Sequence, residues 1–79
     1  MIIEVTQDDI DKGEPRACLS CPVTLALNRI TGEECHVGSY IRIPNFGTFN
    51  YPGQVIEFIN NFDMGRPVNP FSFELHATT

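Results

Sequence analysis

Two amphipathic helical stripes constrain the fold of this chain more than any other feature of its sequence. The first repeats at i, i+3, i+4 and i+7 and consists of Val23, Ala26, Leu27 and Ile30. The second has the same spacing and consists of Val55, Phe58, Ile59 and Phe62. Each stripe begins just after a proline (Pro22, Pro52) and is followed by a glycine (Gly32, Gly65), as is common at helix starts and stops. The sequence therefore predicts two main helices, each burying one face.

Segments with an apolar period of two surround these helices and predict strands. They comprise residues 2–6, 35–43, 48–51 as a hairpin partner, and 71–76. In the longest segment, Val37, Ile41 and Ile43 are expected on one face, and His36, Tyr40 and Arg42 on the other. We therefore predict one compact α+β domain over residues 1–79, with a small sheet of about three to four strands and the two main helices on one face.

A short helix is expected between Thr6 and Gly13. Thr6 is a suitable N-cap, and Asp8, Asp9 and Asp11 place negative charge in or near the first turn, where it suits the helix dipole.

Composition and motifs argue against an enzyme and against a cofactor. With 79 residues, the chain is too short to enclose a large substrate pocket easily. It has no phosphate-binding loop, dinucleotide fingerprint or metalloprotease motif, and neither His36 nor His76 has an evident catalytic partner. No stretch approaches the roughly 18 apolar residues of a membrane span, and the N-terminus does not resemble a signal peptide, so we expect a cytoplasmic protein without membrane contact.

The net charge of −5 disfavours direct binding to nucleic acid and favours basic protein surfaces as partners. The candidate contacts are the acidic residues of two segments: Asp8, Asp9, Asp11 and Glu14, and then Glu33 and Glu34. The alternative is that these charges only keep a small domain soluble and complement helix dipoles.

Four aromatic residues cluster around the expected hairpin: Tyr40, Phe46, Phe49 and Tyr51. Exposed aromatic side chains would suit a binding hot spot, with Tyr40 and Phe46 as the best candidates. The competing interpretation, which we favour for most of the four, is that they fold back onto the core.

Three cysteines, Cys18, Cys21 and Cys35, are expected to be reduced and to act as small buried apolar residues. One alternative is a zinc site formed by Cys18, Cys21, Cys35 and His76 or His36. It has a geometric fault, because Cys35 and His36 are adjacent on a strand and should point to opposite faces. Another alternative is a redox pair, since Cys18 and Cys21 form a Cys-x-x-Cys pattern at a helix start.

Two segments carry a resemblance to a group of short, mostly uncharacterised proteins of bacteriophages, prophages and bacterial genomes. They are VTQDDIDKG (residues 5–13) with CLSCPVTLAL (18–27), and FDMGRPVNPFSFEL (62–75). The group is similar in length but has no assigned activity, so the resemblance implies origin more than function. Small acidic phage proteins that have been characterised include anti-CRISPR inhibitors, which bind basic surfaces of type I interference complexes. We therefore expect an inhibitor of bacterial CRISPR immunity that blocks target DNA, with a zinc-binding module or a phage accessory interaction protein as alternatives.

Overall fold

The computed structural model describes residues 1–76 and confirms the α+β class. The elements in chain order are β1 (Ile2–Val5), α1 (Gln7–Lys12), α2 (Pro22–Thr31), β2 (His36–Val37), β3 (Ile41–Ile43), β4 (Gly47–Phe49), α3 (Gly53–Asp63) and β5 (Phe71–Glu74). No helix among these residues is long and apolar enough to cross a membrane.

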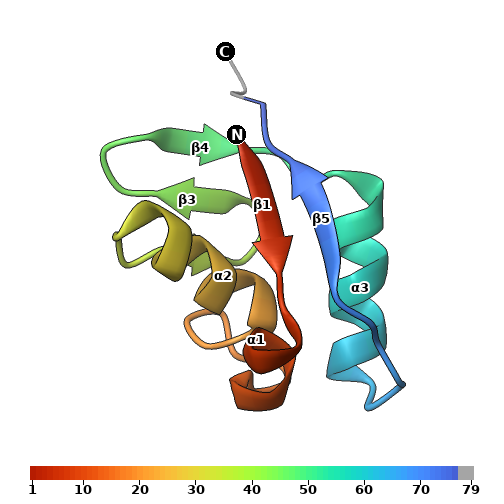
Figure 1. The fold of residues 1–79 in the computed structure, drawn as a ribbon. Coiled ribbons are helices and arrows are strands. Elements are labelled where there is room, and N and C mark those ends of the chain that lie inside the picture. The colour runs from red at the N-terminus through yellow and green to blue at the C-terminus, as the bar shows by residue number, and fades with distance from the viewer. Residues whose placement is uncertain (77–79) are drawn as a thin grey trace.

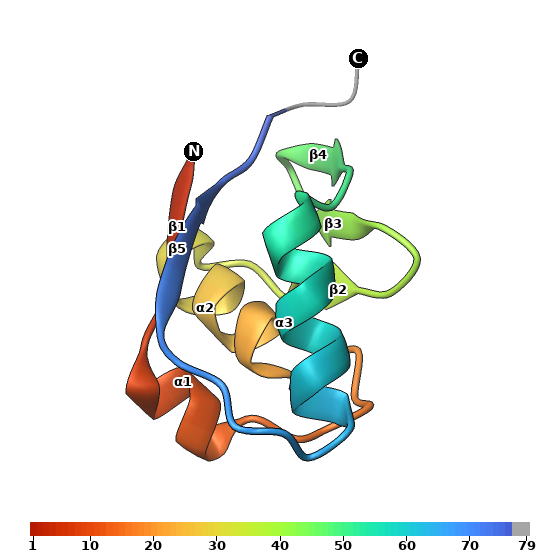
Figure 2. The same ribbon diagram turned by 90° about the vertical axis from the view of Figure 1, so that its right-hand side faces the viewer.

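The strands form two antiparallel sheets, where the sequence suggested a single sheet. β1 pairs with β5 from the opposite end of the chain, with Ile3 opposite Phe73 and Val5 opposite Phe71. The second sheet has the order β2-β3-β4. Figure 2 shows the two sheets at opposite sides of the molecule, with α2 between them, and Figure 1 shows α3 on the outer side of β5. The two main helices therefore do not cover one face of one sheet. α2 contacts β1 of one sheet and β2 of the other, whereas Phe58 of α3 packs against Phe71 of β5.

The predicted strand over residues 35–43 is broken into β2 and β3, which pair with each other across a tight turn. Gly38 lies in this turn and donates its N–H to the carbonyl of Tyr40 at 3.2 Å. The two faces are nevertheless those expected from the sequence. Val37, Ile41 and Ile43 are buried, and His36, Tyr40 and Arg42 are exposed, because the side chains of paired strands keep their alternation across the turn.

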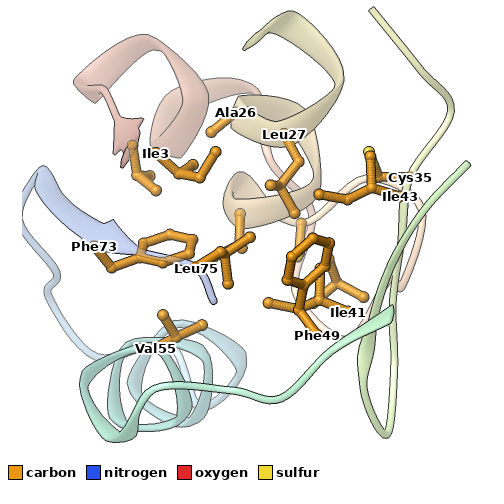
Figure 3. Packing of buried hydrophobic residues seen from close by; sticks show 14 of the residues in the cluster. Ile3, Ala26, Leu27, Cys35, Ile41, Ile43, Phe49, Val55, Phe73 and Leu75 are labelled. Atoms are coloured by element: carbon orange, nitrogen blue, oxygen red, sulfur yellow. The ribbon is translucent and has the colours of Figure 1, made fainter. Parts of the chain in front are cut away.

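The core is enclosed by α2, α3 and the inner faces of both sheets (Figures 1 and 3). Ile3 and Phe73 enter it from the β1-β5 sheet, Ile41 and Phe49 from the other sheet, and Val55 from α3. Burial of apolar surface contributes about 25 cal/mol per Å² to the stability of the fold. The two sheets are therefore held together by the side chains that both contribute to this one core.

The boundaries of α2 follow the sequence signals, but one residue of its predicted apolar stripe is not buried. Cys21 caps α2, and Gly32 ends it with a left-handed φ of 73°, a conformation that glycine adopts without steric cost. Ile30, the expected last member of the first stripe, is 40% exposed. It is the second-last residue of α2, and only the first three stripe positions of this helix reach the core.

Candidate functional site

The acidic segment around α1 divides into an outer and an inner part. Asp8, Asp11 and Glu14 are exposed, whereas Asp9 is only 5% exposed. Asp8 pairs with Lys12 at 3.1 Å, and Asp11 accepts a hydrogen bond from Gln7. The prediction that Asp9 is a partner contact is therefore wrong, because its side chain faces the protein.

Asp9 instead organises the junction of β1, α1 and α2. Its Oδ2 accepts from the backbone N–H of Thr6 at 2.9 Å, and Thr6 Oγ1 accepts from the N–H of Asp9 in return, which makes a capping box. Arg29 of α2 donates from Nη2 to Asp9 Oδ2 at 2.9 Å and also to the carbonyl of Glu4. Burial acts to raise the pKa of Asp9, but the hydrogen bonds from Arg29 and Thr6 outweigh it and hold this pKa below the usual value.

Glu33 and Glu34 follow the C-terminal end of α2. Glu33 is half-buried and accepts from Asn45 Nδ2 at 2.6 Å, whereas Glu34 is exposed. Glu14, in contrast, lies beside the start of α2, because its N–H donates to the carbonyl of Ser20. The ten residues of α2 span about 15 Å, so Glu14 and the Glu33–Glu34 pair do not form one continuous patch.

Two of the four hairpin aromatics are exposed. Tyr40 is 46% and Phe46 is 53% exposed, while Phe49 is buried and Tyr51 is half-buried. Tyr40 lies beside the outer face of the three-stranded sheet, where His36, Arg42 and Thr48 are in register. The candidate aromatic contacts are thus accessible, and their role as contacts stays a prediction.

The structure does not assemble the four residues of the zinc alternative. Cys21 lies at the start of α2, whereas Cys35 is buried near its end, where its N–H is bound by Asn28 Oδ1 at 2.7 Å. Zinc ligands must all lie about 2.0–2.3 Å from one ion, and the length of α2 separates these two. His76 is exposed and has Glu74 as its neighbour, at 3.8 Å. Within residues 1–76, no group of three or more His, Cys, Asp or Glu side chains could hold a metal ion.

The cysteines also differ from the expectation that all three are buried. Cys21 and Cys35 are buried, but Cys18 is exposed. Cys18 and Cys21 line the same cleft of about 360 Å³, together with Tyr51 and with Ile56 and Ile59 of α3. No local sequence pattern reveals this cleft, because its lining residues come from segments distant in the chain. Ile56, an apolar residue of α3 outside the predicted stripe, is a partial signal of it.

One hydrogen bond joins two of the segments that line the cleft. Arg16, which lines the cleft, has a φ of 58° in the left-handed region, a conformation that costs a non-glycine residue about 1–2 kcal/mol. Its N–H donates to Asp63 Oδ1 of α3 at 2.8 Å. This hydrogen bond ties the segment before Cys18 to the C-terminal end of α3 and offsets part of that cost.

Tyr51 and Gly38 both line the cleft, and they are hydrogen-bonded to each other. The hydroxyl of Tyr51 donates to the carbonyl of Gly38 in the β2-β3 turn. Burial raises the pKa of Tyr51 to about 12, and charge on Cys21 and Cys18 adds to this rise. Tyr51 and both cysteines line the same cleft.

No known protein family, curated protein or solved structure matches this chain.

Proposed function

We propose that this protein is a stoichiometric inhibitor that binds a basic protein surface in the cytoplasm of a host bacterium. In the specific form of the proposal, it is a phage-encoded anti-CRISPR protein. Its partner is a type I surveillance complex, from which it excludes target DNA. The resemblance of the two terminal segments to phage and prophage proteins supports the origin, and the surface charge supports the mode of binding.

The distribution of charge is the observation that carries the proposal. Of the ten acidic residues only Asp9 is buried, which leaves nine carboxylates at the surface. Two of the five basic residues, Lys12 and Arg29, are already paired with Asp8 and Asp9. The field outside the protein is therefore negative, which steers it towards positive surfaces and away from phosphate backbones.

The exposed carboxylates around α1 are the preferred contacts. Asp9 points inward, so Asp8 and Asp11 point outward from α1, and Glu14 continues the series along the next segment. Among the described residues, Glu14 makes no side-chain hydrogen bond or ion pair. Carboxylates presented in this way can form ion pairs with Lys or Arg side chains that otherwise bind the phosphates of nucleic acid. Inhibition of this kind needs no chemical reaction.

A competition measurement tests the proposal. Purified protein is titrated into purified type I surveillance complexes of several subtypes, and binding of labelled target DNA is followed by fluorescence anisotropy. We expect loss of DNA binding at a stoichiometric ratio in at least one subtype, with an affinity that falls as salt increases. Undiminished DNA binding in every subtype would overturn the type I assignment.

Charge reversal then tests the contact surface. The triple variant Asp8→Lys, Asp11→Lys, Glu14→Lys should bind at least about tenfold more weakly, which corresponds to about 1.4 kcal/mol. The triple variant Glu4→Lys, Glu57→Lys, Glu74→Lys is the matched control, because it reverses three exposed carboxylates outside the segment from Asp8 to Glu14 and changes the net charge equally. Equal loss in the two triple variants would show that net charge, and not the α1 surface, determines binding.

A further inference from the structure

The segment before α2 brings two thiols together at the cleft. The N–H groups of Ser20 and Cys21 both donate to the carbonyl of Ala17, at 3.3 and 2.9 Å. Both bonds start at Ala17, so the turn that they close, from Ala17 to Cys21, contains both cysteines. Two cysteines three residues apart in such a turn can lie close enough for a disulfide, which spans Cα distances of about 4.4–6.8 Å. Cys18 and Cys21 thus belong to one turn and line one cleft.

The two cysteines have different surroundings, which suggests different roles. Cys18 is exposed and its sulfur makes no hydrogen bond among the described residues. Cys21 is buried, and its Sγ lies 3.2 Å from Thr24 Oγ1 and accepts from the N–H of Thr24 at 3.5 Å. Thr24 Oγ1 donates to the carbonyl of Cys18 at 2.8 Å, so one threonine connects both members of the pair.

We propose that Cys18 and Cys21 form a thiol–disulfide exchange site whose substrate is a low-molecular-weight disulfide. The Cys18 thiolate attacks one sulfur of the substrate, the substrate's S–S bond breaks, and one substrate thiolate leaves and takes up a proton. The Cys21 thiol then loses its proton and attacks Cys18 Sγ, which expels the second substrate thiol. The two protein thiols are oxidised to one disulfide, and the substrate disulfide is reduced to two thiols.

The cleft and Thr24 support both steps. A volume of about 360 Å³ beside an exposed thiol lies within the usual range of small-ligand sites, so the mixed disulfide can be accommodated. The N–H of Thr24 at the start of α2 points at Cys21 Sγ and can donate to this sulfur while it carries negative charge. Cys35 lies beside the C-terminal part of α2, where it is bonded to Asn28 and Thr31, and takes no part.

Thiol counting by mass spectrometry tests the site. The full chain is incubated with oxidised glutathione under native conditions, then denatured and alkylated, and the linked peptides are mapped. Of the three thiols, we expect Cys18 and Cys21 to disappear together as one internal disulfide, leaving Cys35 alkylated. Recovery of all three thiols, a bond to Cys35, or a wild-type product that stops with glutathione on Cys18 would overturn the proposal.

Single variants separate the two roles. Cys21→Ser keeps an oxygen that caps α2 well, and it should accumulate the glutathione adduct on Cys18 because the second step is blocked. Cys18→Ser should remain unmodified at Cys21, and Cys35→Ser should react as the wild type does. Adduct formation on Cys21 in the Cys18→Ser variant would contradict the assignment of Cys18 as the attacking thiol. Circular dichroism of each variant before treatment checks the fold.

The ionisation of Tyr51 gives an independent readout. Because charge on the two cysteines contributes to the raised pKa of Tyr51, and disulfide sulfurs carry no charge, oxidation should lower this pKa. In a Tyr40→Phe background, where Tyr51 is the only tyrosine, absorbance at alkaline pH reports it directly. An identical titration in reduced and oxidised protein would contradict the formation of a disulfide between these two cysteines beside Tyr51.

Discussion

Arg29 in the last turn of α2 donates to the carboxylate of Asp9 in α1 at 2.9 Å, and the same guanidinium nitrogen donates to the carbonyl of Glu4 in β1. One side chain thus fixes the positions of three consecutive elements. Met1 and Leu75 exchange both backbone hydrogen bonds, and in an antiparallel pair every second residue bonds to the partner strand. The carbonyl of Glu4 therefore points away from β5, and Arg29 provides its hydrogen-bond donor.

The Asp9 carboxylate should make the stability of the protein depend on acidic pH. The pKa of Asp9 is lower in the folded protein than its ordinary value of 3.8, so its stabilising effect is complete above that value and is lost as pH falls towards the folded pKa. Asp9→Asn should remove this acid-dependent part and cost about 1–2 kcal/mol at neutral pH. Urea unfolding at a series of pH values measures both effects.

Asp8→Asn is the matched control for that substitution. Asp8 is the neighbouring residue, but its side chain is 70% exposed and pairs only with exposed Lys12. Exposed pairs of this kind contribute between about 0 and 1 kcal/mol, so the control should unfold nearly as the wild type does. Similar losses in the two variants would contradict the central position of Asp9.

Tyr51 should make the folded protein sensitive to alkaline pH in the opposite sense. Its pKa is raised to about 12 from 10.0, so the unfolded chain releases the phenolic proton first. The contribution of Tyr51 is complete below pH 10 and is lost as pH rises through the folded pKa. Tyr51→Phe should abolish this component and, by removing the hydrogen bond to Gly38, cost about 1 kcal/mol. The measurement is the melting temperature of the wild type and of Tyr51→Phe between pH 9 and pH 12. If the melting temperatures of both proteins fall equally with pH, the account of Tyr51 is contradicted.

The two ends of the α2 stripe should respond differently to truncation. Leu27 is fully buried, and Leu27→Ala should cost about 2–5 kcal/mol because it leaves a cavity. Ile30 is 40% exposed, and Ile30→Ala should cost much less. Denaturant midpoints compare the two variants, and equal losses would place Ile30 in the core after all.

The exposed aromatics should matter for binding and not for folding. Phe46→Ser and Tyr40→Ser change side chains that are about half exposed, so the melting temperature should stay nearly constant while affinity for the partner falls. Phe49→Ser, in the same hairpin but 6% exposed, should lower the melting temperature strongly. If the Phe46 and Tyr40 variants bind the partner as the wild type does, the hairpin is not part of the contact surface.

The helices and the strand faces could be predicted from the sequence because they depend on the spacing of residues that are close in the chain. Helical periodicity found α2 and α3, and alternation assigned the correct faces to Val37, Ile41 and Ile43 even though the strand is broken at Gly38. The division into two sheets depends on the pairing of β1 with β5, residues about seventy positions apart, and no local pattern specifies that.

The candidate site was less accessible to sequence analysis than the fold. The burial of Asp9 had a signal, since Thr6 and Asp9 have the spacing of a capping box, but its partner Arg29 lies twenty residues away. The cleft beside Cys18 could not be foreseen, because it forms only when α3 packs against the segment before α2. Distant contacts of this kind require the three-dimensional structure.

The central claim, that this acidic protein inhibits a type I CRISPR system, is tested most directly by phage plaquing. Bacteria with an active type I system and a matching spacer are infected with and without expression of the protein, alongside the triple variant Asp8→Lys, Asp11→Lys, Glu14→Lys and a non-targeting strain. We predict that plaquing is restored by the wild type in the targeting strain, restored poorly by the triple variant, and unchanged in the non-targeting strain. Failure of the wild-type protein to restore plaquing in strains of several type I subtypes would contradict the claim.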